Sequence, residues 1–293
     1  MQQFDERMLQ QLNMPLSDSH KGQNGKLLVI GGSTLFHAAS LWALTIASRL
    51  LDMVFYASVK ENNDIVHELK KEFRNGIVVA RNDIEDYVTE ADVVLIGPGM
   101  MRSEGVKNGE WRMENGETLE KINAIEDEGL QSYYLTKYLL AKYPEKKWVI
   151  DAGALQMMDP EWLKQLNGNA IITPHPAEFE RVFDTQDPME VAKKYNCTIL
   201  LKGEKDLVCS PTESVEIAGG NAGMTKGGTG DVLAGLVSAL ACKNDLFLSA
   251  CAGSYLNKKA GESLYERVGY YFNSSDLAEE IPRVMKKLLL DRK

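Results

Sequence analysis

KLLVIGG, residues 26–32, is a short apolar run that ends in two glycines, and it is the first of six segments of similar character. The other five are MVFYASV (53–59), DVVLIGPG (92–99), KWVIDAGAL (147–155), AIITPHP (170–176) and CTILLKG (197–203). Runs that are rich in β-branched residues and mostly unbroken by polar alternation suit strands buried on both faces. The sequence therefore predicts a parallel sheet covered by helices.

Helix-like stretches fall between the predicted strands, at residues 38–51 and 135–143. Strands that alternate with helices indicate a doubly wound α/β architecture, in which helices flank both faces of a mainly parallel sheet. We expect this fold for the whole chain.

The last third of the chain departs from this alternation. Residues 206–210 and 214–220 flank a short PTE turn and predict a hairpin, which would add an antiparallel edge to the sheet. Helices are expected at residues 232–242 and from about residue 248 to 265.

No linker or repeat interrupts the pattern, so we expect residues 1–293 to form a single domain. The exception is the segment at about 101–131, which holds eight acidic residues against four basic ones and shows little apolar periodicity. It is predicted to be a solvated surface insertion, with a mobile lid or a subunit contact as the alternatives.

The charge of the chain limits its partners. A formal net charge of -9 argues against a nucleic-acid surface and against an anionic membrane. The polar N-terminus shows no signal peptide, and no apolar stretch approaches the roughly 20 residues of a membrane span. We therefore expect a cytoplasmic protein that binds neither nucleic acid nor membrane.

The cysteines indicate neither a metal site nor disulfides. Cys197, Cys209, Cys242 and Cys251 share no CxxC spacing, and three of them lie inside apolar segments. Reduced thiols in the core are the expected state.

The first candidate for a chemical role is GMTKGGTGDVLAG, residues 223–235, which holds five glycines, four of them before a predicted helix. Gly227, Gly228 and Gly230 leave backbone amides open to an anion, and the following helix adds its positive end. Asp231 is either a favourable acid in the first helical turn or a base that takes a proton from a substrate hydroxyl as phosphate arrives.

Two common phosphate-binding motifs do not match this chain. No GxxxxGK[ST] occurs, and the turn after the first predicted strand reads GGSTLFHAAS instead of GxGxxG. Unusual residues do follow three predicted strands, in GPGM (97–100), TPHPAE (173–178) and LKGEKD (201–206). Ligands of open parallel sheets bind beyond the carboxyl ends of the strands, so these turns are expected to line one crevice.

Five blocks in order along the chain resemble the NAD(P)H-hydrate dehydratase family, the nicotinamide nucleotide repair branch of the ribokinase-like superfamily. The blocks are KLLVIGGS (26–33), LIGPGM (95–100), VIDAGAL (149–155), ITPHPAEFERV (172–182) and NAGMTKGGTGDVLAG (221–235). The resemblance extends from about residue 20 to residue 290, and TPHPAE is its most specific part.

The resemblance implies a ribokinase-like fold and a dehydration driven by a nucleotide. The hydroxyl of hydrated NADH or NADPH is phosphorylated and phosphate is then lost, which regenerates NAD(P)H. Bacterial and archaeal members typically use ADP and release AMP, whereas eukaryotic members typically use ATP, so we expect ADP, or else ATP, as co-substrate. The family also implies Mg²⁺ and a homo-oligomer, commonly a tetramer.

The resemblance also assigns roles residue by residue. Asp231 would be the base, with Gly228, Thr229 and Gly230 forming the anion hole and Gly230 also touching the nucleotide. The adenine nucleotide would be lined by Lys202, Gly203, Glu204, Lys205 and Asp206. The hydrated dinucleotide would contact Ala38, Gly99, His175 and Asp231.

Plainer roles stay open for four of the polar residues. His175 lies between two prolines and suits a rigid turn, while Glu178 either helps to hold Mg²⁺ or caps the next helix. Lys202 either binds phosphate or extends from a strand end toward solvent. Asn221 either orients the glycine-rich loop or satisfies a turn.

The leading functional hypothesis is an ADP-dependent NAD(P)H-hydrate dehydratase, and a small-molecule kinase of the same superfamily is the alternative. Such a kinase would act on a sugar, a hydroxymethylpyrimidine or a thiazole alcohol, with the same Asp231 but no elimination step. A nucleotide-binding regulator without catalysis is a third hypothesis.

Overall fold

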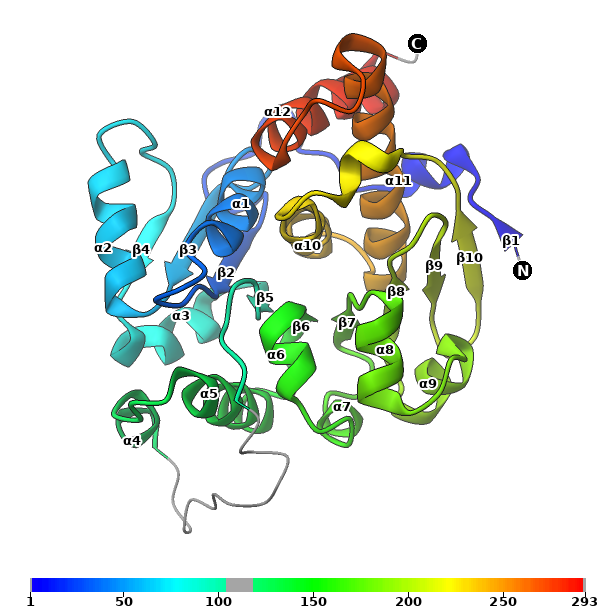
Figure 1. Cartoon of the computed structure of the whole chain (residues 1–293). Coiled ribbons are helices and arrows are strands. Elements are labelled where there is room, and N and C mark those ends of the chain that lie inside the picture. The colour runs from blue at the N-terminus through cyan, green and yellow to red at the C-terminus, as the bar shows by residue number, and fades with distance from the viewer. Residues whose placement is uncertain (1, 104–117, 292–293) are drawn as a thin grey trace.

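A single sheet organises the protein (Figure 1). The computed structural model describes residues 2–103 and 118–291. Within these residues ten strands pair in the order β1-β10-β9-β8-β7-β6-β5-β2-β3-β4. The strands are β1 Gln2–Gln3, β2 Lys26–Ile30, β3 Met53–Ala57, β4 Ile77–Val79, β5 Val93–Ile96, β6 Lys147–Ile150, β7 Ala170–Ile172, β8 Thr198–Leu201, β9 Asp206–Cys209 and β10 Ser214–Ile217.

The pairing confirms a mainly parallel sheet. All neighbours from β4 across to β8 are parallel, whereas β9 is antiparallel to both β8 and β10. The predicted hairpin is therefore present at one side of the sheet. It is not the outermost element, because Gln2 and Gln3 of β1 pair in parallel with β10.

Helices cover both faces of the sheet, and Figure 1 shows α1, α10, α11 and α12 together, across the sheet from α5, α6, α7 and α8. The helices are α1 Ala38–Ala47, α2 Lys60–Leu69, α3 Ile84–Glu90, α4 Leu119–Asn123, α5 Glu128–Lys142, α6 Ala152–Met157, α7 Trp162–Gln165, α8 Pro176–Phe183, α9 Pro188–Tyr195, α10 Thr229–Ala241, α11 Leu246–Val268 and α12 Ser274–Met285. Shorter helical turns are η1 Glu6–Gln11, η2 Arg81–Asp83, η3 Ala222–Thr225 and η4 Lys286–Leu290.

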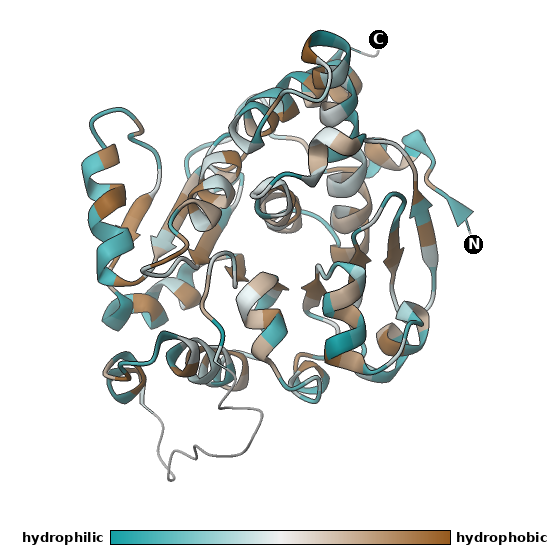
Figure 2. Cartoon of the chain, in the orientation of Figure 1, coloured by the Kyte–Doolittle hydropathy of each residue, from teal (hydrophilic) through white to brown (hydrophobic). Residues whose placement is uncertain are grey.

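The core has two halves, one on each face of the sheet. On β2, Leu27 and Val29 join a buried cluster with α1, α10 and α11, whereas Leu28 and Ile30 join a second cluster with α3, α5 and α6. In Figure 2 the strands in the middle of the sheet are mainly hydrophobic, whereas the helices around them carry both hydrophilic and hydrophobic residues. Burial on both faces explains the absence of polar alternation in the strand sequences and confirms the doubly wound α/β architecture.

Several predicted strands end earlier than expected, because the turn residues at their carboxyl ends leave the sheet. β5 ends at Ile96 before a Gly-Pro-Gly turn, and β7 ends at Ile172 before Thr173. β6 ends at Ile150, and residues 152–155 belong to helix α6, so the prediction of a strand over 147–155 is wrong for these residues. These ends leave the polar and glycine residues outside the sheet, where ligands of such folds bind.

The acidic segment at about 101–131 is partly helical, which corrects its description as a stretch of little apolar periodicity. Helix α4 lies within it and α5 begins at Glu128; Leu119, Ile122 and Leu130 are buried. The rest of this prediction falls on residues 104–117, which lie outside the described residues. Where the structure describes the segment, its apolar residues pack on the core instead of lying in solvent.

The four cysteines are free and buried, as expected for thiols of the core. Across residues 2–103 and 118–291, no helix is long and apolar enough to cross a bilayer.

A buried lysine of α11 holds the loop between β8 and β9 against the end of β10. The Lys258 ammonium lies 3.3 Å from Oδ1 of Asp206 and donates to the carbonyls of Gly203, Glu204 and Gly219. Ser254 donates to the other oxygen of Asp206 at 2.7 Å. The loop after β8 therefore takes its shape from a buried charge pair.

Replacing Lys258 by Met is expected to lower the free energy of unfolding by about 3 kcal/mol, because it leaves the Asp206 carboxylate buried without its cation. The matched control is Lys259→Met on the same helix, since Lys259 pairs with Glu262 and both side chains are about one third exposed. That change should cost less than about 1 kcal/mol. Chemical denaturation measures both, and equal losses would contradict a special role for Lys258.

Candidate active site

The three unusual strand ends lie at the same carboxyl edge of the sheet, where β6 separates the end of β5 from those of β7 and β8. That they line one crevice stays a prediction. The Gly32 amide donates to the carbonyl of Pro98 at 2.7 Å, which joins the turns after β2 and β5. The Lys202 amide donates to the carbonyl of Pro174 at 2.8 Å, which joins the ends of β8 and β7. The turn after β6 lies between these two pairs in the sheet.

The GPGM turn is shaped by close backbone approaches. Gly97 has φ of 123°, and a Cβ there would lie 1.8 Å from the carbonyl oxygen of Asp151. Gly99 has φ of 73°, and a Cβ there would lie 2.8 Å from the carbonyl oxygen of Phe36, just before Ala38 begins helix α1. Gly99 and Ala38, the predicted dinucleotide contacts, therefore belong to neighbouring turns.

The glycine-rich loop is fixed from three sides before it enters α10. Asn221 accepts from the Gly223 amide at 2.9 Å and donates to the Gly261 carbonyl at 2.8 Å, so it orients the loop as well as capping a turn. Lys226 donates to the carbonyl of Phe272 at 2.6 Å. Ser274 donates to the carbonyl of Gly227 at 2.7 Å.

Helix α10 begins at this loop with the amides of its first turn at the carboxyl edge of the sheet. Gly228 precedes the helix with φ of 93°, and Thr229 uses its hydroxyl to hold the carbonyls of Met224 and Lys226. The Gly230 amide belongs to the first turn, whose donors have no acceptor inside the helix. The arrangement suits an anion, because these amides and the helix dipole favour negative charge.

Asp231 lies in the first turn of α10 with an unusual acidity. Burial, and next the negative charge of Asp151, raise the pKa of Asp231 to about 7, although the Lys202 ammonium opposes the shift. A carboxylate with a pKa near neutrality can accept a proton more readily than an ordinary aspartate. The geometry is therefore compatible with the predicted base as well as with a helix-capping acid.

Asp151 is a residue of this site that the sequence analysis did not single out. It directly follows β6, is 2% exposed, and accepts from the Thr173 hydroxyl at 2.7 Å and from the Lys202 ammonium at 3.0 Å. An acid immediately after a buried strand, inside the VIDAGAL block, was the available signal. The ion pair shows that Lys202 turns into the site instead of extending to solvent.

His175 and Glu178 form a reciprocal cap at the start of α8. The Glu178 amide donates to Nδ1 of His175 at 3.2 Å, and the His175 amide donates to the Glu178 carboxylate at 2.9 Å. Gln156 donates to the other oxygen of that carboxylate. The capping role of Glu178 is thus present, while its role toward Mg²⁺ stays a prediction.

The predicted adenine loop is divided between surface and interior. Gly203, Glu204 and Lys205 are exposed, and Lys205 pairs with Glu216 at 3.0 Å. The Asp206 carboxylate is turned away from solvent toward Lys258. Apart from Lys202, which turns into the site, only Glu204 and Lys205 of this segment therefore offer side chains to a ligand.

The described residues contain no group of three or more His, Cys, Asp or Glu side chains placed to hold a metal ion. Mg²⁺ is usually held by one or two carboxylates together with water and substrate phosphates, so a site completed by a nucleotide needs no such group. Glu178, the predicted ligand, carries a carboxylate of the kind that such a site uses.

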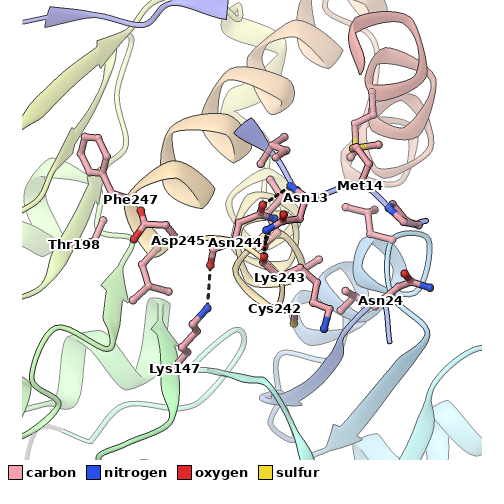
Figure 3. Close-up of a pocket in the computed structure, with 18 of the residues that line it drawn as sticks. Asn13, Met14, Asn24, Lys147, Thr198, Cys242, Lys243, Asn244, Asp245 and Phe247 are labelled. Atoms are coloured by element: carbon pink, nitrogen blue, oxygen red, sulfur yellow. Dashed lines mark hydrogen bonds between the residues drawn. The ribbon is translucent and has the colours of Figure 1, made fainter. Parts of the chain in front are cut away.

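A cavity of about 1420 Å³ lies at the opposite edge of the sheet (Figure 3). Its lining includes Lys147 and Thr198, the first residues of β6 and β8, together with Asn244 and Phe247. None of the predicted site residues, all of which the structure describes, lines this cavity. It is therefore separate from the candidate active site.

Comparison with solved structures identifies the class of protein. The chain superposes on a ribokinase-like superfamily protein from Enterococcus faecalis with a TM-score of 0.81 and 22% identity, covering 98% of this chain and 96% of that one. It also matches a Bacillus subtilis ADP/ATP-dependent NAD(P)H-hydrate dehydratase, co-crystallised with ATP/Mg²⁺, with a TM-score of 0.74, 21% identity and 98% coverage of each chain. The fold is ribokinase-like.

Sequence comparison then gives the family. The model of the NAD(P)H-hydrate dehydratase family matches residues 27–283, so the chain belongs to that family. It is 33% identical to an ADP-dependent (S)-NAD(P)H-hydrate dehydratase of Nitrosopumilus maritimus, over 92% of this chain and 91% of that protein. It is 38% identical to a bifunctional NAD(P)H-hydrate repair enzyme of Methanocaldococcus jannaschii, over 92% of this chain and 50% of that protein. The chain thus spans about half the length of this bifunctional relative.

Gly228 and Gly227 provide a matched test of the loop. Gly228→Ala should lower the free energy of unfolding by about 2 kcal/mol or more, because φ is positive and a Cβ would lie 2.1 Å from the Trp42 ring. Gly227→Ala should change it by less than about 0.5 kcal/mol, since no atom lies within 4 Å of the added carbon. Thermal and chemical unfolding of both variants measure the difference, and equal effects would contradict the described loop.

Asp231→Asn should make the protein more stable at about pH 8 than the parent, by on the order of 2 kcal/mol. The folded-state pKa of about 7 exceeds the ordinary value of 3.8, so the folded protein holds the proton more tightly than the unfolded chain. The stability of the parent therefore falls as pH rises between these two values. Unfolding of parent and variant at about pH 5 and about pH 8 measures this, and a gain independent of pH would contradict the assigned pKa shift.

Proposed function

We propose that this protein is an ADP-dependent (6S)-NAD(P)H-hydrate dehydratase. The observation that carries the proposal is the position of Asp231 in the first turn of α10, close to Gly230 and the Lys202 ammonium, together with a pKa raised to about 7. The similarity to an ADP-dependent relative at 33% identity over nearly the whole of both chains supports the activity and the choice of ADP.

The first step is phosphorylation of the substrate hydroxyl. Asp231 accepts the hydroxyl proton, the oxygen attacks the terminal phosphorus of ADP, and the bond to the leaving AMP breaks. The amides at Gly228, Thr229 and Gly230 and the Lys202 ammonium would stabilise the negative charge on the transferring group. When bound, Mg²⁺ would neutralise nucleotide phosphates, which would hold it together with Glu178 as the predicted protein ligand.

The second step is elimination. The C–O bond to the phosphorylated oxygen breaks, inorganic phosphate leaves, and a proton is lost from the adjacent ring carbon, so that the double bond of NADH or NADPH is restored. Phosphate is a better leaving group than hydroxide, which explains why a nucleotide is consumed. The products are NAD(P)H, AMP, phosphate and a proton.

The ligands would occupy neighbouring parts of the carboxyl edge. Ala38, Gly99 and His175 would contact the hydrated dinucleotide, and the exposed loop from Gly203 to Lys205 would lie against the adenine nucleotide. Asp206 would shape that loop through the buried pair of its carboxylate with Lys258 and would not itself touch the nucleotide. Since phosphoryl transfer joins the two ligands, the shared end of both sites would be Asp231.

Four further expectations stay predictions. They are a homo-oligomer such as a tetramer, a cytoplasmic location, a requirement for Mg²⁺, and a single domain over residues 1–293. Sedimentation, fractionation of cells, chelation and limited proteolysis test them in turn.

The test of function is recovery of the near-ultraviolet absorbance of NADH after the protein is mixed with NADH hydrate, Mg²⁺ and ADP, with ATP in a parallel reaction. Recovery should accompany release of one phosphate per NADH. Below about pH 7, kcat/KM should fall as Asp231 becomes protonated. Asp231→Asn should lower kcat at least about a hundredfold while ADP affinity changes little.

Lys226→Met is the matched control. Lys226 anchors the same loop, but its ammonium donates to the backbone carbonyls of Tyr270 and Phe272 and not to Asp231. It should reduce kcat far less than the loss of the base does. Folded protein that binds ADP but restores no NADH with either nucleotide would overturn the proposal, and phosphorylation of a small alcohol would then establish a kinase.

A further inference from the structure

The Asp151 carboxylate makes its hydrogen bonds outside the strand that precedes it and the helix that follows it. Asp151 precedes α6, but its side chain makes no capping hydrogen bond there. Its Oδ1 instead accepts hydrogen bonds from the Thr173 hydroxyl, after β7, and from the Lys202 ammonium, after β8. A buried carboxylate with such contacts links three neighbouring strand ends.

Lys202 lies between this carboxylate and the start of α10. Its side chain is 20% exposed, and its Nζ is 3.6 Å from the point where a Cβ of Gly230 would lie. Burial disfavours the ammonium, but the charges of Asp151, Glu178 and Asp231 outweigh burial and raise the pKa of Lys202. The side chain is therefore a cation next to the anion-binding amides.

The backbone around Asp151 is held tightly in place. Ala152 has φ of 42°, a conformation that residues with a Cβ seldom adopt. Gly97 lies against the carbonyl of Asp151, and a Cβ on Gly153 would lie 2.1 Å from the carbonyl of Met100. The turn after β6 is thus packed tightly against the turn after β5. Such surrounding contacts can hold a strained backbone, here that of Ala152, in place.

We propose that Asp151 is a positioning residue that holds the Lys202 ammonium beside Gly230, where the phosphates of the nucleotide arrive, and keeps it from pairing with Asp231. The proposal rests on the proposed function for the identity of the anion, a nucleoside diphosphate. Asp151 itself need not touch substrate.

Keeping Lys202 from pairing with Asp231 matters because a paired cation would make Asp231 a weaker base. A lysine paired directly with Asp231 would stabilise the ionised carboxylate and make it a poorer proton acceptor. Three charged groups act on Asp231 from neighbouring elements: Asp151 and Glu178 raise its pKa, and Lys202 lowers it. The ion pair with Asp151 therefore separates phosphate binding from proton transfer.

The first test follows the ionisation of Asp231. The free energy of unfolding is measured against pH for each variant, and again for the same variant with Asp231→Asn added. The difference between the two curves reports the pKa of Asp231. Asp151→Asn should shift that ionisation to lower pH by about one unit, because a negative charge is lost and Lys202 turns to Asp231. Lys202→Met should shift it to higher pH. Loss of stability without these opposite shifts would show a merely structural role and overturn the proposal.

The second test is a double-mutant cycle on ADP affinity, measured by calorimetry without NADH hydrate. Asp151→Asn and Lys202→Met should each weaken ADP binding about tenfold, and the double variant should bind no more weakly than Lys202→Met. Thr173→Val, which keeps the charge of Asp151, is the control and should weaken binding less than about threefold. Additive losses, about a hundredfold in the double variant, would overturn the proposal.

The outcomes separate this inference from the proposed function. Protein that binds ADP with a non-additive cycle but restores no NADH would refute the dehydratase and leave the role of Asp151 standing. Protein that does not bind ADP would overturn the role of Lys202 in phosphate binding, and the proposal with it. If Asp151→Asn does not fold, Lys202→Met alone tests the proposal. An unchanged pKa of Asp231 in that variant would contradict the proposed position of the Lys202 ammonium.

Discussion

The ion pair between Asp151 and Lys202 is the interaction on which the candidate site depends. It joins the ends of β6 and β8 across β7, and the Thr173 hydroxyl at the end of β7 donates to the same carboxylate oxygen. A buried charge pair contributes little net stability when compared with apolar packing, yet loss of one partner leaves an uncompensated charge. Its value here is orientation, because it fixes a cation at the entrance to α10.

The fold concentrates opposing requirements in this small volume. The free amides at the start of α10 and the Lys202 ammonium favour negative charge, whereas burial and the charge of Asp151 disfavour ionised Asp231. Both conditions suit phosphoryl transfer from a hydroxyl, in which a proton leaves as a negatively charged group arrives. The parallel sheet makes this arrangement feasible, since it brings the ends of several strands to one edge.

The supporting contacts are mostly between backbone and lysine or glycine. Lys258 shapes the loop after β8, Lys226 and Ser274 hold the glycine-rich loop, and Gly97 allows the turns after β5 and β6 to touch. The cavity at the far edge of the sheet takes no part in these contacts. The candidate site is therefore identified by the strand ends that share one edge of the sheet, and not by the size of a cavity.

The sequence by itself determined the buried strands, the alternation with helices, the hairpin, the helix at Asp231 and the family, because apolar runs, glycines and ordered motif blocks are local signals. It missed strand β4, which has only three residues, and the helices α2 and α12, although both are amphipathic, and it left open whether Glu178 caps a helix. Only the tertiary structure showed that Asp151 pairs with Lys202, 51 residues further along the chain, and that the Asp206 carboxylate turns inward to Lys258. Such contacts depend on the order of the strands and on burial, and neither can be predicted from the residues that neighbour Asp151 or Asp206 in the sequence.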